Sequence, residues 1–290
     1  MEISVRAFAK LNLTLDVTGR APDGYHDMLM IMQGASLCDE LTVRAERGEG
    51  NVTVSSGLPY VPSDERNIAA KAARLFIDAR ELSGWDINID VVKRIPVCAG
   101  LGGGSSDAAA VLRALNVLFD EKLTAEELRE MSRPLGSDVP YCVSFGTMLA
   151  EGRGDILTPL AALPECGTVI CKPRFSVSTP ELFTKLDSRP TCHHPDTSGI
   201  LAALEAGDLG GICRRMYNVF EDVGDRRMKT VAEIKTKLMD AGALGAVMTG
   251  TGSAVFGIYA DLGAAERAAG VLGREYKCCF AAGPVGTLEV

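Results

Sequence analysis

A glycine-rich stretch between an expected strand and an expected helix constrains this chain more than any other feature. It runs from Ile95 to Ala110 and holds four glycines and two serines directly before a helical pattern. Trp85 to Val92, just before it, alternates apolar and polar residues, which is typical of a half-buried strand. Apolar residues at helical spacing follow it: Val111, Leu112, Leu115, Leu118 and Phe119. The local order is therefore strand, glycine loop, helix.

A loop of this kind is suited to bind phosphate. Glycines let backbone N–H groups face a ligand without obstruction by side chains. The first amides of the following helix lack internal partners, and the helix dipole is positive there. Neither common phosphate motif fits, because no lysine follows the glycines and Ser105 stands where a dinucleotide fingerprint has its third glycine. The alternative to a phosphate cradle is a flexible loop or a tight turn.

Length and charge bound the remaining possibilities. The 290 residues are enough for one large or two ordinary domains, and we place a boundary near residue 160, between residues 1–160 and 161–290. A net charge of -8 argues against nucleic acid as a partner. No apolar run is long enough to cross a membrane, and the first ten residues lack the apolar core of a signal peptide.

The cysteines indicate the redox compartment. The chain has nine of them and no C-x-x-C pair, which favours reduced thiols and a cytoplasmic location. Cys192, His193 and His194 are adjacent, but no second pair of ligands has the spacing of a zinc site. We therefore interpret them as a surface loop.

Hydrophobic periodicity places further elements along the chain. Expected strands cover residues 3–8, 11–17, 28–33, 40–44, 52–55, 168–172, 254–259 and 276–281. Expected helices cover residues 67–82, 124–131, 180–186, 198–206, 208–220, 228–241 and 261–272. Thr124 and Glu127 form the pattern of a capping box at the start of one helix. A second glycine-rich turn lies at residues 247–253.

Three polar features lie outside the glycine loop. Lys10 stands between two strand-like apolar runs and is either a solvated strand end or a cation aimed into a site. Tyr25 and His26 follow a Pro-Asp-Gly turn and are either ordinary surface or an aromatic face that stacks on a base. Asp138 lies between a glycine turn and an apolar segment, where a helix cap is the structural alternative to a reactive carboxylate.

Taken together, these residues resemble a known family. Pro96 to Ala109 is similar to the P-x-x-x-G-L-G-x-x-S-S-x-A signature of the GHMP kinase superfamily. Ala9 to Leu13 and the turn at Met248 to Gly252 match its other two motifs. Asp23 to His26 and Leu135 to Pro140 narrow the resemblance to the branch that phosphorylates a cytidine diphosphate derivative of methylerythritol. Ser137, within Leu135 to Pro140, stands where the family usually has alanine.

The resemblance implies a fold and an activity. The fold would be a two-domain α+β GHMP kinase fold, with an N-terminal domain like ribosomal protein S5 domain 2 and a ferredoxin-like C-terminal domain. The activity would be ATP- and Mg²⁺-dependent phosphorylation of the 2-hydroxyl of 4-diphosphocytidyl-2-C-methyl-D-erythritol, in the non-mevalonate route to isoprenoid precursors. The partner would be this small molecule, bound by a monomer or a homodimer.

The resemblance also implies roles for single residues. Lys10 and Asp138 would be catalytic, with Asp138 against the reacting hydroxyl. ATP contacts would come from Asn67, Lys93, Pro96, Gly100, Leu101, Gly102, Gly103, Gly104, Ser105 and Ser106. Substrate contacts would come from Asn12, Tyr25, His26, Asp138 and Phe183. Mg²⁺ would be held through ATP, with Ser106 as the candidate protein ligand.

Two other functions remain open at this stage. A different small-molecule kinase of the superfamily, such as a homoserine kinase, predicts no use for Tyr25 and His26. A non-enzymatic nucleotide-binding member would be expected to have lost Lys10 or Asp138, and both are present.

Overall fold

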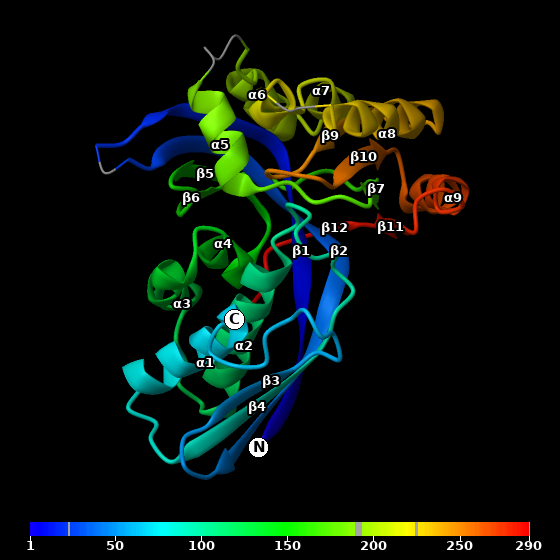
Figure 1. Ribbon diagram of the computed structural model, residues 1–290. Coiled ribbons are helices and arrows are strands. Elements are labelled where there is room, and N and C mark those ends of the chain that lie inside the picture. The colour runs from blue at the N-terminus through cyan, green and yellow to red at the C-terminus, as the bar shows by residue number, and fades with distance from the viewer. Residues whose placement is uncertain (23, 189–192, 224–225, 290) are drawn as a thin grey trace.

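The computed structural model describes residues 1–22, 24–188, 193–223 and 226–289 and is built on two β-sheets (Figure 1). The larger sheet has the order β3-β4-β2-β1-β8, with β12 and β5 on β2 and β6 on β5; the smaller has the order β11-β7-β10-β9. The strands are β1 (Glu2–Arg20), β2 (His26–Arg47), β3 (Val52–Ser55), β4 (Trp85–Val92), β5 (Thr147–Gly152), β6 (Ile156–Pro159), β7 (Gly167–Lys172), β8 (Tyr217–Asn218), β9 (Gly245–Met248), β10 (Val255–Tyr259), β11 (Cys278–Ala282) and β12 (Pro284–Val285).

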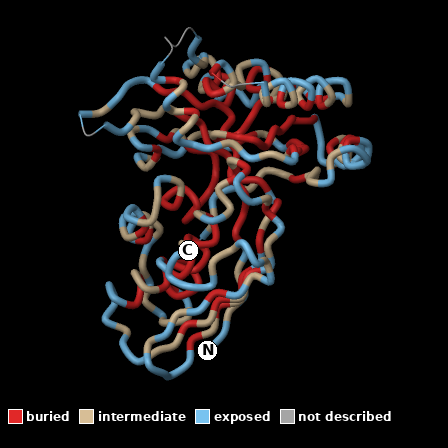
Figure 2. Tube along the Cα trace, viewed as in Figure 1, coloured by how far each residue is buried: buried red, intermediate tan, exposed pale blue. Residues whose placement is uncertain are grey.

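Helices cover both sheets, and the buried residues lie between these layers (Figure 2). α1 and α2 pack on each other and on the larger sheet, whereas α8 and α9 pack on the smaller one. Ile170 and Phe256 of the smaller sheet cluster instead with Ile200 of α6 and Ile212 of α7. The helices are α1 (Ile68–Ala79), α2 (Gly103–Leu118), α3 (Ala125–Ser132), α4 (Val139–Ser144), α5 (Thr179–Asp187), α6 (Thr197–Glu205), α7 (Leu209–Cys213), α8 (Met228–Asp240) and α9 (Leu262–Leu272), with 3₁₀ turns η1 (Arg133–Leu135) and η2 (Val219–Glu221).

The alternation of β1 explains why a lysine stands between two apolar runs. Leu11 and Leu13 are buried in the same hydrophobic cluster as the smaller sheet. Because side chains alternate along a strand, Lys10 and Asn12 share the opposite face. Lys10 is only 4% exposed, so the interpretation as a solvated strand end is wrong. The strands expected over residues 3–8 and 11–17 form one continuous strand, β1, which stays paired with β2 through several bulges.

A buried ion cluster fixes the segment that leads into the glycine loop. Lys93 places Nζ 2.5 Å from Oδ2 of Asp39 and 2.6 Å from Oδ2 of Asp107. The other oxygen of Asp39 accepts hydrogen bonds from the N–H groups of Arg94 and Ile95. Burial favours the neutral amine of Lys93, but the two carboxylates outweigh it and raise its pKa. Burial raises the pKa of Asp107 to about 7, against the opposing charge of Lys93.

Most expected elements are present, and the α+β fold class is confirmed. The capping box of Thr124 and Glu127 is formed. Asn67 is the N-cap of α1 rather than its first residue, and that helix ends at Ala79 instead of residue 82. β8 and β12 lie beyond residue 160 yet join the larger sheet, so the domain boundary stays a prediction.

The expected helix over residues 208–220 is wrong beyond its first turns. α7 ends at Cys213, and the chain then pairs with β1 as β8. The side chain of Asn218 donates to the carbonyl oxygens of Met248 and Gly250, 2.8 Å from each. These contacts with residues some thirty positions away override the local helical pattern.

Two expected absences concern membranes and metals. Of the helices within the described ranges, none is long and apolar enough to cross a membrane. Among the same residues, no group of three or more His, Cys, Asp and Glu side chains could hold a metal ion. Cys192, part of the Cys-His-His sequence, lies outside the described residues.

Asp107→Asn is expected to change how stability depends on pH. Since the pKa of Asp107 is raised from 3.8 to about 7 on folding, the unfolded chain loses this proton first as pH rises. The carboxyl group therefore favours folding below about pH 4, and this contribution is lost toward about pH 7. The free energies of unfolding of the wild type and of Asp107→Asn are measured with urea at about pH 5 and about pH 8. The difference between them should change in favour of the variant at the higher pH.

Asp120→Asn is the matched control, because the side chain of Asp120 is exposed. If the wild type instead became more stable relative to Asp107→Asn as pH rises, the assigned direction of the pKa shift of Asp107 would be wrong.

Candidate active site

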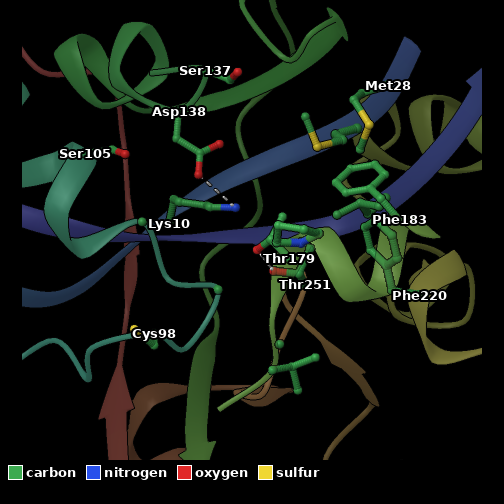
Figure 3. Close-up of a pocket in the computed structure, with 18 of the residues that line it drawn as sticks. Lys10, Met28, Cys98, Ser105, Ser137, Asp138, Thr179, Phe183, Phe220 and Thr251 are labelled. Carbon is green, nitrogen blue, oxygen red and sulfur yellow. Dashed lines mark hydrogen bonds and ion pairs between the residues drawn. The ribbon is translucent and has the colours of Figure 1, made fainter. Parts of the chain in front are cut away.

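Two cavities meet at the glycine loop. The larger, of about 610 Å³, is lined by Lys10, Asp138 and Phe183 and by both glycine-rich turns (Figure 3). The smaller, of about 420 Å³, is lined by Lys93, by residues 95–105 and by the segment before α1. The two share Cys98, Gly100, Gly102 and Ser105. This arrangement offers space for two ligands that approach each other at the loop.

Lys10 and Asp138 face each other in the larger cavity. Nζ of Lys10 lies 3.5 Å from Oδ2 of Asp138. Asp138 occupies the N-cap position of α4, yet its side chain makes no capping hydrogen bond. Its side chain is 31% exposed, whereas that of Lys10 is 5% exposed. The geometry therefore favours a carboxylate that serves the cavity over one that caps a helix.

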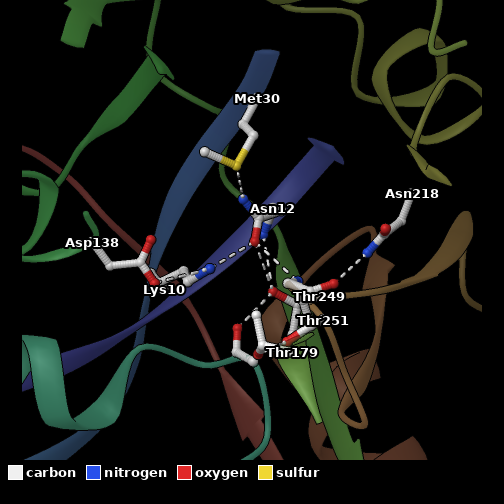
Figure 4. A network of polar contacts seen from close by, with 10 residues as sticks. Lys10, Asn12, Met30, Asp138, Thr179, Asn218, Thr249 and Thr251 are labelled. Atoms are coloured by element: carbon white, nitrogen blue, oxygen red, sulfur yellow. Dashed lines mark hydrogen bonds and ion pairs between the residues drawn. The ribbon is translucent and has the colours of Figure 1, made fainter. Parts of the chain in front are cut away.

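Asn12 links the ammonium group to the second glycine-rich turn (Figure 4). Its Oδ1 accepts hydrogen bonds from Nζ of Lys10, at 2.8 Å, and from the N–H of Gly250, at 3.0 Å. Its backbone N–H donates to Oγ1 of Thr249, 3.1 Å away. Asn12 is fully buried, so it positions Lys10 within the protein, and its contact with substrate stays a prediction.

The two glycine-rich turns lie directly against each other. Oγ1 of Thr249 donates to the carbonyl oxygen of Gly100, 3.2 Å away. A Cβ at Gly100 would lie 2.2 Å from the carbonyl oxygen of Thr249, and one at Gly102 would lie 2.7 Å from Cγ of Lys10. Both glycines have positive φ angles, of 77° and 68°. Glycine is therefore required at both positions by conformation and by space.

The start of α2 has the form of an anion site. Its N-cap is Gly102, which has no side chain to bond the first N–H groups. Gly103, Gly104 and Ser105 of its first turn line the smaller cavity. Ser106 is fully buried, and its hydroxyl has no hydrogen-bond partner among the described residues. The backbone N–H groups of this turn thus border the smaller cavity, as an anion site requires, whereas the role of the buried Ser106 hydroxyl stays a prediction.

The other residues expected to contact ATP also border the smaller cavity, but their side chains have partners in the protein. Asn67 caps α1 through a bond to the N–H of Ala69 and donates to the carbonyl oxygen of Pro62. Lys93 is held by its two carboxylates. Pro96 and Leu101 line the cavity as well, with Leu101 almost fully buried. Their contacts with ATP stay predictions.

The residues expected to bind the base are brought together only in part. His26 stacks on Phe183, with ring centroids 4.5 Å apart and an interplanar angle of 27°. Phe183 packs edge-on against Phe220. Tyr25 is 57% exposed and lies under the guanidinium of Arg153, whose Cζ is 3.8 Å from the ring centroid. The stacking roles of Tyr25 and Phe183 stay predictions.

Sequence reasoning did not place several residues at the site. Arg153 lines the larger cavity from the turn between β5 and β6. Oγ1 of Thr251 lies 2.8 Å from Oγ1 of Thr179 at its wall. Asp187 bonds His26 from the end of α5. The match of Met248 to Gly252 to a family motif was a signal for the threonine turn, whereas Arg153 and Asp187 carried no local signal.

The comparisons with known proteins agree with this geometry. The family model of the GHMP kinases N terminal domain matches residues 67–146, and that of the GHMP kinases C terminal domain matches residues 200–278. The chain is 42% identical over 278 residues to a 4-diphosphocytidyl-2-C-methyl-D-erythritol kinase of Alkaliphilus metalliredigens, covering 95% of this chain and 94% of the relative. It is 43% identical to the enzyme of that name from Lachnoclostridium phytofermentans, covering 92% and 91%.

Solved structures extend the similarity to the whole fold. A crystal structure of a 4-(cytidine 5'-diphospho)-2C-methyl-D-erythritol kinase superposes with a TM-score of 0.82 at 33% identity, covering 98% of this chain and 100% of that one. A homoserine kinase of Cytophaga hutchinsonii superposes with a TM-score of 0.75 at 18% identity, covering 99% and 96%, which is a likeness of fold alone. The chain therefore belongs to the 4-diphosphocytidyl-2-C-methyl-D-erythritol kinases, a family of the GHMP kinases.

Proposed function

We propose that this chain transfers the γ-phosphoryl group of ATP to the 2-hydroxyl of 4-diphosphocytidyl-2-C-methyl-D-erythritol, in the non-mevalonate route to isoprenoid precursors. The observation that carries the proposal is the identity of about two residues in five with kinases of that name over nearly the whole chain. The cavity holding Lys10 and Asp138 beside the glycine loop supports it.

Lys10 and Asp138 supply the chemistry in this proposal. Phosphoryl transfer depends on positioning and on stabilising charge more than on covalent help from the protein. Asp138 orients the substrate hydroxyl and accepts its proton. Lys10, 3.5 Å away and almost buried, stabilises the charge that develops on the transferred group. Its bond to Asn12 fixes the ammonium group in that position.

The glycine loop and the start of α2 hold the phosphates of ATP. Gly102, Gly103, Gly104 and Ser105 present backbone N–H groups there, in line with the anion affinity of a helix N-terminus. Mg²⁺ bound to the phosphates would neutralise their charge. The buried hydroxyl of Ser106, which has no partner among the described residues, fits a ligand of that ion.

Base recognition is assigned to the tip of the β1–β2 hairpin and to α5. Tyr25 would stack on the cytosine, His26 would hydrogen-bond it, and Phe183 would offer the opposite face. The stacking of His26 on Phe183 supports their action as one unit. A cytoplasmic location and action as a monomer or a homodimer complete the proposal.

Asp138→Asn is expected to lower kcat by about 10²–10⁴-fold, because the amide cannot accept the proton of the hydroxyl. The KM for ATP should change little, since the glycine loop is intact. Steady-state kinetics measure both constants. Ser137→Ala is the neighbouring control, which restores the usual family residue and should keep kcat. A normal kcat in Asp138→Asn would remove this carboxylate from the mechanism.

Ser106→Ala is expected to separate cation binding from folding. Removing a buried hydroxyl without a partner should leave the Tm of the ligand-free protein unchanged or higher, because such a group costs about 1–3 kcal/mol. If the hydroxyl binds Mg²⁺, the Mg²⁺ concentration for half-maximal activity should rise. Thermal unfolding without ligand and a Mg²⁺ titration at fixed ATP test the two parts. An unchanged titration would argue against Ser106 as a ligand.

The substrate assignment is tested with a panel of alcohols in a coupled ATPase assay. Turnover is expected with 4-diphosphocytidyl-2-C-methyl-D-erythritol and not with homoserine or mevalonate. Tyr25→Ala should raise the KM for the cytidine substrate by roughly 5- to 150-fold, the equivalent of about 1–3 kcal/mol of stacking. Tyr25→Phe, which keeps the ring, should be nearly neutral.

The KM for ATP serves as the internal control of this experiment. If Tyr25→Ala raised only that constant, or if homoserine were the better substrate, the assignment to the cytidine substrate would be wrong.

A further inference from the structure

His26 is held from one side by a carboxylate that the base-binding proposal does not use. Nε2 of His26 lies 2.7 Å from Oδ1 of Asp187. Asp187 is the last residue of α5, and its other oxygen lies 3.7 Å from Nη1 of Arg20. The side chain of His26 is 14% exposed. Since the hydrogen bonds of this ring to the described residues involve Nε2, Nδ1 is the nitrogen left for a ligand.

One face of α5 fixes both the plane and the edge of the imidazole ring. Phe183 and Asp187 are four residues apart, so they lie on the same side of the helix. Phe183 supports the flat face of His26, and Asp187 bonds its Nε2 edge. Phe220, packed edge-on at a centroid distance of 4.9 Å, supports Phe183 in turn. The ring of His26 is thus constrained in two directions.

The carboxylate also decides which nitrogen carries the proton. An ionised carboxylate only accepts hydrogen bonds, so its bond to His26 requires a proton on Nε2. In the neutral ring Nδ1 is then an acceptor. Cytosine presents an amino donor at N4, whereas a uracil-type base presents an acceptor oxygen at the same place. An acceptor at Nδ1 therefore favours cytosine and opposes uracil.

The stacking geometry is compatible with this bond. A hydrogen bond to Nδ1 places the donor atom of the base close to the plane of the imidazole ring. The plane of His26 is 27° from that of Phe183. A base that lies in the imidazole plane would then be nearly parallel to Phe183, as stacking requires.

We propose that Asp187 is a positioning residue that sets the preference for cytosine, by holding His26 in the tautomer with Nδ1 as an acceptor. This inference rests on the proposed function, in which His26 contacts the base. Asp187 itself touches neither the base nor the reacting groups.

The test compares kcat/KM for the cytidine substrate and its uridine counterpart in the full-length enzyme. His26→Ala, which removes the acceptor, should lower the ratio of the two values by roughly 5- to 150-fold. Asp187→Asn can donate to Nε2 and so permits the other tautomer, and Asp187→Ala frees the ring. Both should lower the ratio at least about fivefold, the lower end of that range.

Arg20→Gln is the matched control. It removes the other charged partner of Asp187 and leaves the bond to His26 in place, so it should keep the wild-type ratio. A loss in Arg20→Gln as large as in the Asp187 variants would assign the effect to the hairpin tip as a whole and overturn the proposal.

The tautomer is read directly by ¹⁵N NMR of the ring nitrogens, which is tractable because the chain has three histidines. The signal of the neutral ring in the wild type should show Nε2 protonated and Nδ1 unprotonated. Asp187→Asn should move both signals toward intermediate positions. A proton on Nδ1 in the wild type would overturn the proposal, whatever the kinetics.

The outcomes separate this inference from the proposed function. If His26→Ala lowers the ratio and neither Asp187 variant does, the function stands and the role of Asp187 is wrong. If His26→Ala keeps the ratio, His26 does not read the base, and the role of Asp187 fails with it.

Discussion

The burial of one ammonium group organises the centre of this molecule. A charge taken out of water must be paired or bonded, or it becomes too costly to keep. Lys10 meets this requirement through Asn12 and Asp138, and Asn12 in turn bonds the turn that contains Gly250. The first strand, the start of α4 and a turn some 240 residues later are thereby fixed around one charge. Displacing the start of α4 would cost the ammonium group one of its two partners, and displacing the turn would remove the bond that holds Asn12.

The sequence predicted what local chemistry determines. The order strand, glycine loop and helix at Trp85–Val92 and α2 was predictable because strand alternation, glycines and helical periodicity are all short-range signals. Short-range signals could not decide whether Lys10 is a solvated strand end or a cation aimed into a site. The alternation along β1 places Lys10 on the face opposite Leu11. That this face is also buried depends on elements distant in sequence, which local patterns do not reveal.

Contacts between distant segments explain what could not be predicted. The region after α7 has a helical pattern in the sequence. In the structure the side chain of Asn218 donates hydrogen bonds to the turn at Met248 to Gly250, and the segment pairs with β1 as a strand instead of forming a helix. Asp187 and Arg153 look like ordinary surface charges in sequence, because their partners His26 and Tyr25 lie more than a hundred residues away. Such pairings depend on how α5 and the β5–β6 turn approach the hairpin tip, which no local pattern encodes.

The surroundings of Lys10 and the tip of the β1–β2 hairpin are built in two ways, and the difference follows from solvent exposure. Around Lys10 the polar groups are buried, and a small displacement would leave hydrogen bonds unmade at full cost. At the tip of the β1–β2 hairpin Tyr25 is mostly exposed, and the pairs formed by Asp187 are partly screened by water. Changes at the hairpin tip are therefore expected to cost less stability than changes around Lys10. The role proposed for Asp187 fits this location, because a change of the His26 tautomer there would leave the buried network around Lys10 in place.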